Sequence, residues 1–80
     1  MFINFLIGVK MRKIKKLLPD LWQIYDGSAL VGSMFKSSID GKPCYRVEFT
    51  QSNDTAYGYF GLETAKAVAK HGSYKDLKAV

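Results

Sequence analysis

Alternating apolar and polar positions in the middle of the chain predict an antiparallel sheet. The alternation is clearest over residues 44–51, where positions 45, 47 and 49 are apolar and positions 46, 48 and 50 are polar. This period is typical of a strand with one face on a core and the other in water. Residues 22–25, 29–36 and 55–60 are further strand candidates, and the last two runs contain Gly32 and Gly58, which weaken a strand or mark a bulge.

Turn residues separate these runs. Asp26-Gly27 follows residues 22–25, Asp40-Gly41 follows residues 29–36, and Ser52-Asn53-Asp54 follows residues 44–51. Asp-Gly between alternating runs is a strong hairpin signal, because a type I′ turn needs two residues that tolerate positive φ. We therefore expect an antiparallel meander of three or four strands.

The start of the chain has a helical period instead. Ile7, Met11, Ile14 and Leu18 fall on one stripe of a helix over residues 5–18. Pro19 disfavours helix at the residue before it and has no backbone N–H, so the helix should end there. A strand over residues 2–9 is the alternative, since short apolar runs fit either element.

A second helical period follows the strands, carried by Leu62, Ala65, Val68 and Ala69. Gly72 comes after a basic last turn, as at many helix C-termini. Ser73 with Asp76 three residues later is similar to a capping box that opens a further short helix. The sequence therefore predicts either one C-terminal helix or a pair broken at Gly72.

Together these elements predict a single small α+β domain over residues 1–80. It would consist of a basic amphipathic helix (1–19), an antiparallel sheet (20–61) and a helical C-terminus (62–80), with the helices on the face that carries Tyr45, Val47 and Phe49. A chain of this length buries only about 60% of its unfolded surface, so a homo-oligomer such as a dimer is left open.

The net charge of +5 is concentrated near the start of the chain. The first twenty residues carry +4 and the remaining sixty carry +1. Five cations lie between residues 10 and 16: Lys10, Arg12, Lys13, Lys15 and Lys16. Like charges this close together repel on a helix, so we expect an anionic neighbour that offsets the repulsion. Nucleic-acid phosphate, an anionic membrane face or an acidic protein would each fit.

Catalysis and metal binding are not expected. Cys44 and His71 are the only cysteine and histidine, whereas a zinc site takes three or four protein ligands. No third group supports a nucleophile and base pair made of these two residues. The carboxylates are scattered, with Asp26, Asp40 and Asp54 in predicted turns, Glu48 in a strand and Glu63 in a first helical turn, and they give no acid and base pair. We therefore predict a protein that is not an enzyme and has no cofactor and no small-molecule substrate.

A cytoplasmic location is expected. The single Cys44 cannot form an internal disulfide, which favours a reducing compartment. The apolar segment precedes the basic one, the reverse of a secretory signal, and residues 2–9 are too few for the roughly 20 apolar residues of a membrane span. Met11 is a second candidate start codon.

Two segments resemble signatures of the RNA-recognition motif. Residues 57–60 (Tyr-Gly-Tyr-Phe), followed by a predicted helix, are similar to the aromatic strand whose side chains stack on bases in that family, and residues 1–6 resemble its first strand. Thr55-Ala56 replaces the basic residue and glycine of that family, and two hairpins replace its βαββ order. The helix, three strands, helix order also resembles a double-stranded-RNA-binding domain, without the lysines that open its last helix. Both are analogies that assign no functional residue, and strand packing is the simpler explanation of Tyr57, Tyr59 and Phe60.

Binding is thus the expected activity, and its target is left open. The first hypothesis is association with the backbone of RNA or DNA. The second is an inhibitor or anti-defence protein of the phage or mobile-element kind that binds a host protein. A membrane-surface protein held by the basic helix is the third. The residues expected to contact phosphates are Lys10, Arg12, Lys13, Lys15, Lys16, Arg46, Lys66 and Lys70.

Overall fold

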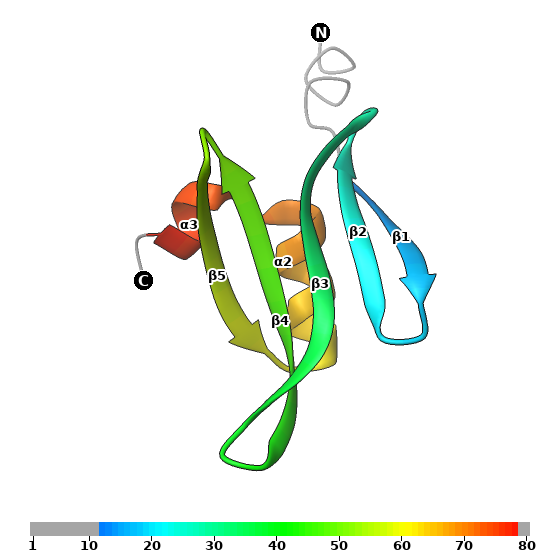
Figure 1. Cartoon of the computed structure of the whole chain (residues 1–80), viewed down its shortest axis with the longest axis vertical. Helices are drawn as coiled ribbons and strands as arrows, with labels where there is room; N and C mark the ends of the chain where they lie inside the picture. Colours follow the sequence, from blue (N-terminus) through cyan, green and yellow to red (C-terminus); the bar gives the residue numbers. More distant parts are fainter. Residues whose placement is uncertain (1–11, 79–80) are drawn as a thin grey trace, which may run out of the picture.

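The computed structural model describes residues 12–78 (Figure 1). The elements, in chain order, are β1 (Lys13–Leu18), β2 (Leu21–Asp26), β3 (Ala29–Ile39), β4 (Lys42–Gln51), β5 (Asp54–Phe60), α2 (Leu62–His71) and α3 (Tyr74–Lys78). The strands form one antiparallel sheet in the order β1-β2-β3-β4-β5, and both helices lie on the same side of it. Residues 12–78 therefore form two layers, and no helix of this described part of the chain covers the other face of the sheet.

The predicted N-terminal helix is wrong over residues 13–18, and the described residues form a sheet of five strands instead of three or four. Residues 13–18 form β1, which pairs antiparallel with β2 through partners such as Ile14 with Ile24. A strand sends successive side chains to opposite faces, so it separates the like charges that a helix would crowd. Ile14 alone of this segment packs on the core, whereas Leu17 and Leu18 are about half exposed. The helical stripe was therefore a coincidence of spacing.

The remainder of the predicted helix, residues 5–11, lies outside the described residues, as does the alternative strand over residues 2–9. Without a helix before the sheet, residues 12–78 do not follow the order of a double-stranded-RNA-binding domain. They also lack a helix between strands, so they do not follow the order of an RNA-recognition motif. Neither analogy describes the topology that the structure shows.

Each hairpin turn consists of two residues. Asp40-Gly41 and Ser52-Asn53 have positive φ at both positions, as the predicted type I′ turn requires. The turn after β2 differs from the expectation. Its central residues are Gly27 and Ser28, and only Gly27 has positive φ, which is the pattern of a type II′ turn. Short turns keep neighbouring strands adjacent and so produce the simple meander.

The core lies between the sheet and the helices. Its buried residues are Ile24, Met34, Val47, Phe49, Ala56, Ala65, Ala69 and Leu77. Val47 and Phe49 alternate with polar neighbours as the sequence predicted, and the helices cover their face. The helix α2 contributes only alanines to the fully buried set, so it can approach the sheet closely.

The C-terminal helix is broken at Gly72, one of the two predicted arrangements. Half of the predicted capping box is present, because the Ser73 hydroxyl accepts from the Asp76 backbone N–H at 3.3 Å. The return bond differs from that of a capping box, since Asp76 Oδ2 accepts from the Ser73 hydroxyl at 3.1 Å. Gly72 has an extended backbone with φ −78°, so its role is not a left-handed cap. A Cβ there would lie 2.8 Å from the carbonyl oxygen of Val68, and the glycine is needed for space.

Gly32 is required where β3 passes β4. A Cβ at this position would overlap the carbonyl oxygen of Glu48 and lie 3.1 Å from the Phe49 ring. We expect Gly32→Ser to lower the free energy of unfolding by about 2–3 kcal/mol, the cost of overpacking a core. Urea unfolding followed by circular dichroism measures this. Gly61→Ser is the matched control: Gly61 has open space around it and no side-chain cap, so serine should change stability by only a few tenths of a kcal/mol. Equal stability of both variants would contradict the packing explanation.

A side-chain cluster ties α3 to β5. Asp54 Oδ2 accepts a hydrogen bond from the Tyr74 hydroxyl and lies 2.9 Å from Lys78 Nζ. The bonds from Lys78 and from Tyr74 lower the pKa of the Asp54 carboxyl below its ordinary value. The charged form of Asp54 is therefore favoured in the folded state, and the cluster stabilises the last helix only while Asp54 is ionised.

Asp54→Asn should reveal this pH dependence. Because the pKa of Asp54 is lowered on folding, its contribution is complete above about pH 4, the ordinary range of aspartate, and is lost as the pH falls through the lower folded pKa. The variant should be less stable than the parent at neutral pH, and the difference should shrink in acid. Urea unfolding across this range measures the difference. A gap between parent and variant that stays constant into acid would show that the charge is not the cause.

Candidate functional site

Five of the predicted phosphate-binding residues surround one hollow of about 400 Å³ between β1 and α2. We call it the basic hollow, and its lining residues are Arg12, Lys13, Ile14, Lys16, Trp22, Met34, Lys66 and Lys70. Among the described residues, no carboxylate lines it. The ion pairs among residues 12–78 join other side chains, Arg46 to Glu48 and Lys78 to Asp54. The charges around the basic hollow are therefore not neutralised by a described acidic residue.

Arg12 is fixed in place by the end of α2. Its Nη1 donates to the carbonyl oxygen of Ala69 at 3.2 Å, and its guanidinium carbon lies 4.9 Å from the centre of the Phe49 ring. A cation near the last carbonyls of a helix is favoured by the helix dipole. Arg12 therefore joins the edge of the sheet to α2 and contributes charge to the basic hollow from a constrained position.

The lysines approach the basic hollow from both layers. Lys66 and Lys70 lie four residues apart on α2 and so occupy neighbouring positions on one helix face. From β1, Lys16 places its Nζ 5.6 Å from the centre of the Trp22 ring. Lys66 and Lys70 repel each other because like charges four residues apart on a helix are neighbours, and a bound anion would offset this repulsion. The arrangement suits an anion with several charges.

Protection of the β1 edge against pairing with another chain explains only some of the cations around the basic hollow. Among the described residues β1 pairs with β2 alone, and lysines on an edge strand discourage pairing with another chain. This role accounts for Lys13, Lys15 and Lys16. It does not account for Lys66 and Lys70, which come from a helix some fifty residues later and line the same hollow.

The other predicted residues are placed elsewhere. Lys10 lies outside the described residues. Lys15 alternates with Lys16 and so lies on the other side of the sheet, opposite Gln23. Arg46 also lies on that side, because Val47 and its alternate neighbours face the helices. We call this side the uncovered face, and its central residues are Lys15, Leu21, Gln23, Ser33, Phe35, Arg46, Glu48, Tyr57 and Tyr59.

Arg46 forms a compact cluster on the uncovered face. Its Nη1 donates to the Tyr59 hydroxyl at 2.9 Å, and its guanidinium lies 3.9 Å from the centre of the Tyr57 ring. Its Nε is 2.6 Å from Glu48 Oε2, although the orientation is not that of a hydrogen bond. Burial lowers the pKa of Arg46, but the bond to Tyr59 and the charge of Glu48 raise that pKa by more. Arg46 is therefore charged and already partnered, which is poorly suited to the phosphate-binding role that the sequence predicted.

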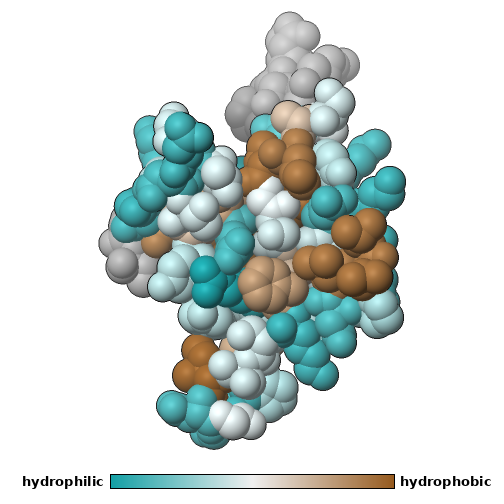
Figure 2. Space-filling model, in the orientation of Figure 1, coloured by the Kyte–Doolittle hydropathy of each residue, from teal (hydrophilic) through white to brown (hydrophobic). Residues whose placement is uncertain are grey.

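The sequence did not reveal that Trp22 lines the basic hollow, or that Tyr57 and Tyr59 point outward. Tyr57 is 50% exposed and Tyr59 is 37% exposed, so packing does not bury them as expected, whereas Phe60 packs on the core. Their alternation with Gly58 and with buried Ala56 is the signal that would have placed them on the uncovered face. The apolar residues of this face lie among polar ones (Figure 2).

The structure does not bring Cys44 and His71 together. Cys44 alternates with Tyr45 and lies on the uncovered face, whereas His71 ends α2 on the other side of the sheet. Within residues 12–78, no group of three or more His, Cys, Asp or Glu side chains is placed to hold a metal ion. In the same part of the chain, neither helix has the length and apolar character needed to cross a membrane.

Comparison of the chain with protein-family models, curated proteins and solved structures gave no match. What the protein binds must therefore be inferred from the geometry of the basic hollow and of the uncovered face.

Replacing Arg12 tests whether this residue anchors α2 to the sheet. Arg12→Met keeps an apolar side chain over Phe49 but removes the donor to Ala69 and the cation at the end of α2. We expect the free energy of unfolding to fall by about 1 kcal/mol. Urea unfolding measures it, and Lys75→Met, at an exposed position on α3, is the control and should shift stability by less than about 0.5 kcal/mol. Arg12→Met with the stability of the parent would show that Arg12 does not anchor α2.

Proposed function

We propose that the protein binds nucleic acid through its phosphates, with the basic hollow as the main contact. The observation that carries the proposal is the convergence of Lys66 and Lys70 from α2 with cations of β1 around one hollow that has no acidic lining residue. Phosphate contacts by lysine and arginine supply most of the sequence-independent affinity for nucleic acid. In this proposal β1 and α2 together take the role that the sequence assigned to a basic N-terminal helix.

The position of the basic hollow also supports a long polyanion over a small one. It opens at the edge of the sheet, where Lys13 lines both the basic hollow and a second hollow beside Tyr25 on the other face. Lys15 lines that second hollow as well. Positive charge therefore continues around β1 from one face of the sheet to the other, as a chain of phosphates requires.

A protein partner is the second candidate function. It is favoured by Leu17 and Leu18, which are 51% and 57% exposed side by side at the end of the β1–β2 hairpin. Exposed neighbouring apolar residues of this kind occur in protein interfaces. An inhibitor of a host protein would use this end of the sheet and would bind with little dependence on salt. The membrane-surface hypothesis required an amphipathic helix over residues that form β1, so it is not retained.

Salt titration of Lys66→Gln/Lys70→Gln tests the proposal. Binding of a labelled duplex of about 20 base pairs, followed by fluorescence anisotropy, should show a log–log salt slope between about −2.7 and −3.6 for the parent, as three or four phosphate contacts imply. The double variant should lose about 1.8 of that slope, since each contact contributes about 0.9 on duplex DNA.

Lys42→Gln/Lys75→Gln is the matched control, because both lysines are exposed and neither lines the basic hollow. This variant removes the same charge and should keep the parent slope. An equal loss in the two double variants would mean that net charge acts without a defined site. Absence of salt-dependent binding by the parent would contradict the proposal and favour the protein partner.

A further inference from the structure

The uncovered face carries two rows of side chains that run across the strands. One row joins Leu21, Phe35, Arg46 and Tyr59, and the other joins Lys15, Gln23, Ser33, Glu48 and Tyr57. The first row is apolar and aromatic apart from the cation Arg46. The second begins with a cation on β1, continues through hydrogen-bonding groups and ends at an exposed ring on β5. In Figure 1 the helices lie behind the sheet, so they leave these rows accessible.

Tyr57 and Tyr59 form an outward aromatic pair. Their ring centres are 5.9 Å apart in an edge-to-face arrangement, and the Arg46 guanidinium lies over both rings. Arg46 holds the Tyr57 ring from one side, so that half of the residue remains exposed. Rings that are fixed in this way lose little conformational entropy when a planar ligand stacks on them.

The electrostatics of this face favour an anionic ligand over a neutral protein surface. Glu48 is the only carboxylate in the interior of a described strand, and Arg46 neutralises it at 2.6 Å. The other acidic residues of residues 12–78 lie in turns, at strand ends or on the helices. Lys13 and Lys15 add positive charge at the β1 end of the face.

We propose that the uncovered face binds the bases of single-stranded nucleic acid, with Tyr57 and Tyr59 as the stacking residues. This deepens the function proposed above and depends on it. Aromatic side chains beside a positively charged path are the usual combination in proteins that bind single strands, since every base has a face that can stack. A duplex keeps its base faces inside, so it could use the basic hollow but not these rings.

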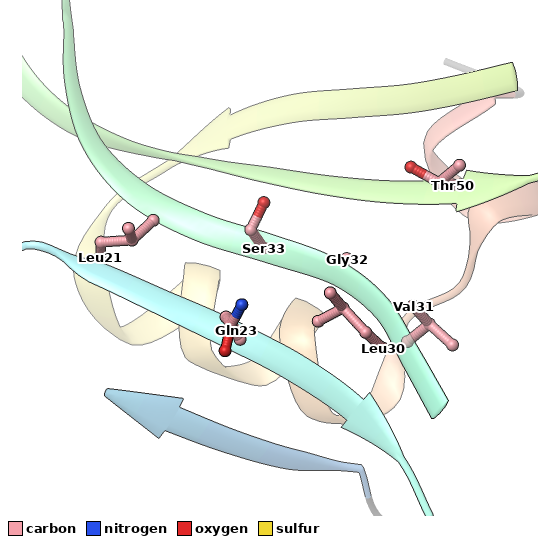
Figure 3. A pocket seen from close by; sticks show the side chains of 7 residues that line it. All are labelled: Leu21, Gln23, Leu30, Val31, Gly32, Ser33 and Thr50. Carbon is pink, nitrogen blue, oxygen red and sulfur yellow. The ribbon is translucent and has the colours of Figure 1, made fainter. Parts of the chain in front are cut away.

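The width of the sheet agrees with a strand that crosses it. Four strand spacings of about 4.8 Å place Lys15 and Tyr57 about 19 Å apart, which several nucleotides can span. Between them lies a shallow hollow of about 450 Å³ lined by Leu21, Gln23, Leu30, Val31, Gly32, Ser33 and Thr50 (Figure 3). Leu21, Gln23 and Ser33 of its lining belong to the uncovered face, so the hollow lies beside Ser33 in the second row.

Tyr57→Val and Tyr59→Val test the stacking residues. Valine keeps the preference for a strand and removes the ring. The probes are a labelled oligo(dT) and oligo(U) of about 12 nucleotides, a duplex of the same length, and inorganic polyphosphate, which has phosphates but no bases. The parent should bind the single strands more tightly than the duplex or polyphosphate. Each valine variant should bind the single strands about 5- to 100-fold more weakly, the usual effect of losing one stacked base.

Two controls make the result specific. Tyr57→Phe keeps the ring and should bind as the parent does. The salt slope of the valine variants should stay unchanged, because stacking releases no counterions, whereas Lys66→Gln/Lys70→Gln should lower the slope on every probe. Retained duplex binding shows that a valine variant is folded.

The outcomes separate the two proposals. Equal affinity of the parent for all probes, or valine variants that bind single strands like the parent, would overturn base stacking and leave phosphate binding intact. Failure of the parent to bind any probe would overturn both, and the uncovered face would then be better explained as a protein interface.

Discussion

Burial of one face of the sheet beneath two short helices is the constraint on which the structure depends. The five strands present two faces, and α2 and α3 together cover one. Ala65 and Ala69 let α2 lie close to Val47 and Met34, so a small core can be filled without large helical side chains. The described helices supply nothing for the other face, whose side chains must be stable in contact with solvent or with a partner.

Local signals predicted the parts of the fold that local chemistry decides. Asp40-Gly41 favours positive φ at both positions, and the alternation around Val47 fixes which side of β4 faces the core. β1 could not be predicted in this way. Lysine and leucine favour helix, and Ile14 fits a helical stripe as well as it fits a strand. Pairing with β2 decides the outcome, and the partners of Ile14 and Leu18 on β2 lie outside the apolar stripe.

In the candidate site, too, the sequence shows the local features but not the contacts that form only in the folded chain. The basic cluster of β1 is visible in the sequence, but the structure divides it between the two sides of the sheet, with Lys16 toward α2 and Lys15 on the uncovered face. The participation of Lys66 and Lys70 follows from where α2 crosses the sheet. Tyr57 was assigned to packing because aromatic residues in strands usually pack. Its exposure follows from the absence of a described helix over that face, which no single residue encodes.

Arg46 shows why charge alone is a poor guide to function. Its guanidinium is held by Tyr59, by the charge of Glu48 and by the face of the Tyr57 ring, so a phosphate would have to compete with a carboxylate already 2.6 Å away. The same contacts make Arg46 effective at fixing the two rings. The lysines around the basic hollow are the opposite case, because no described carboxylate neutralises them. Under the two proposals, these partners imply a division of labour: the lysines would attract a polyanion around the β1 edge, and Arg46 would position the aromatic surface that distinguishes bases from phosphate alone.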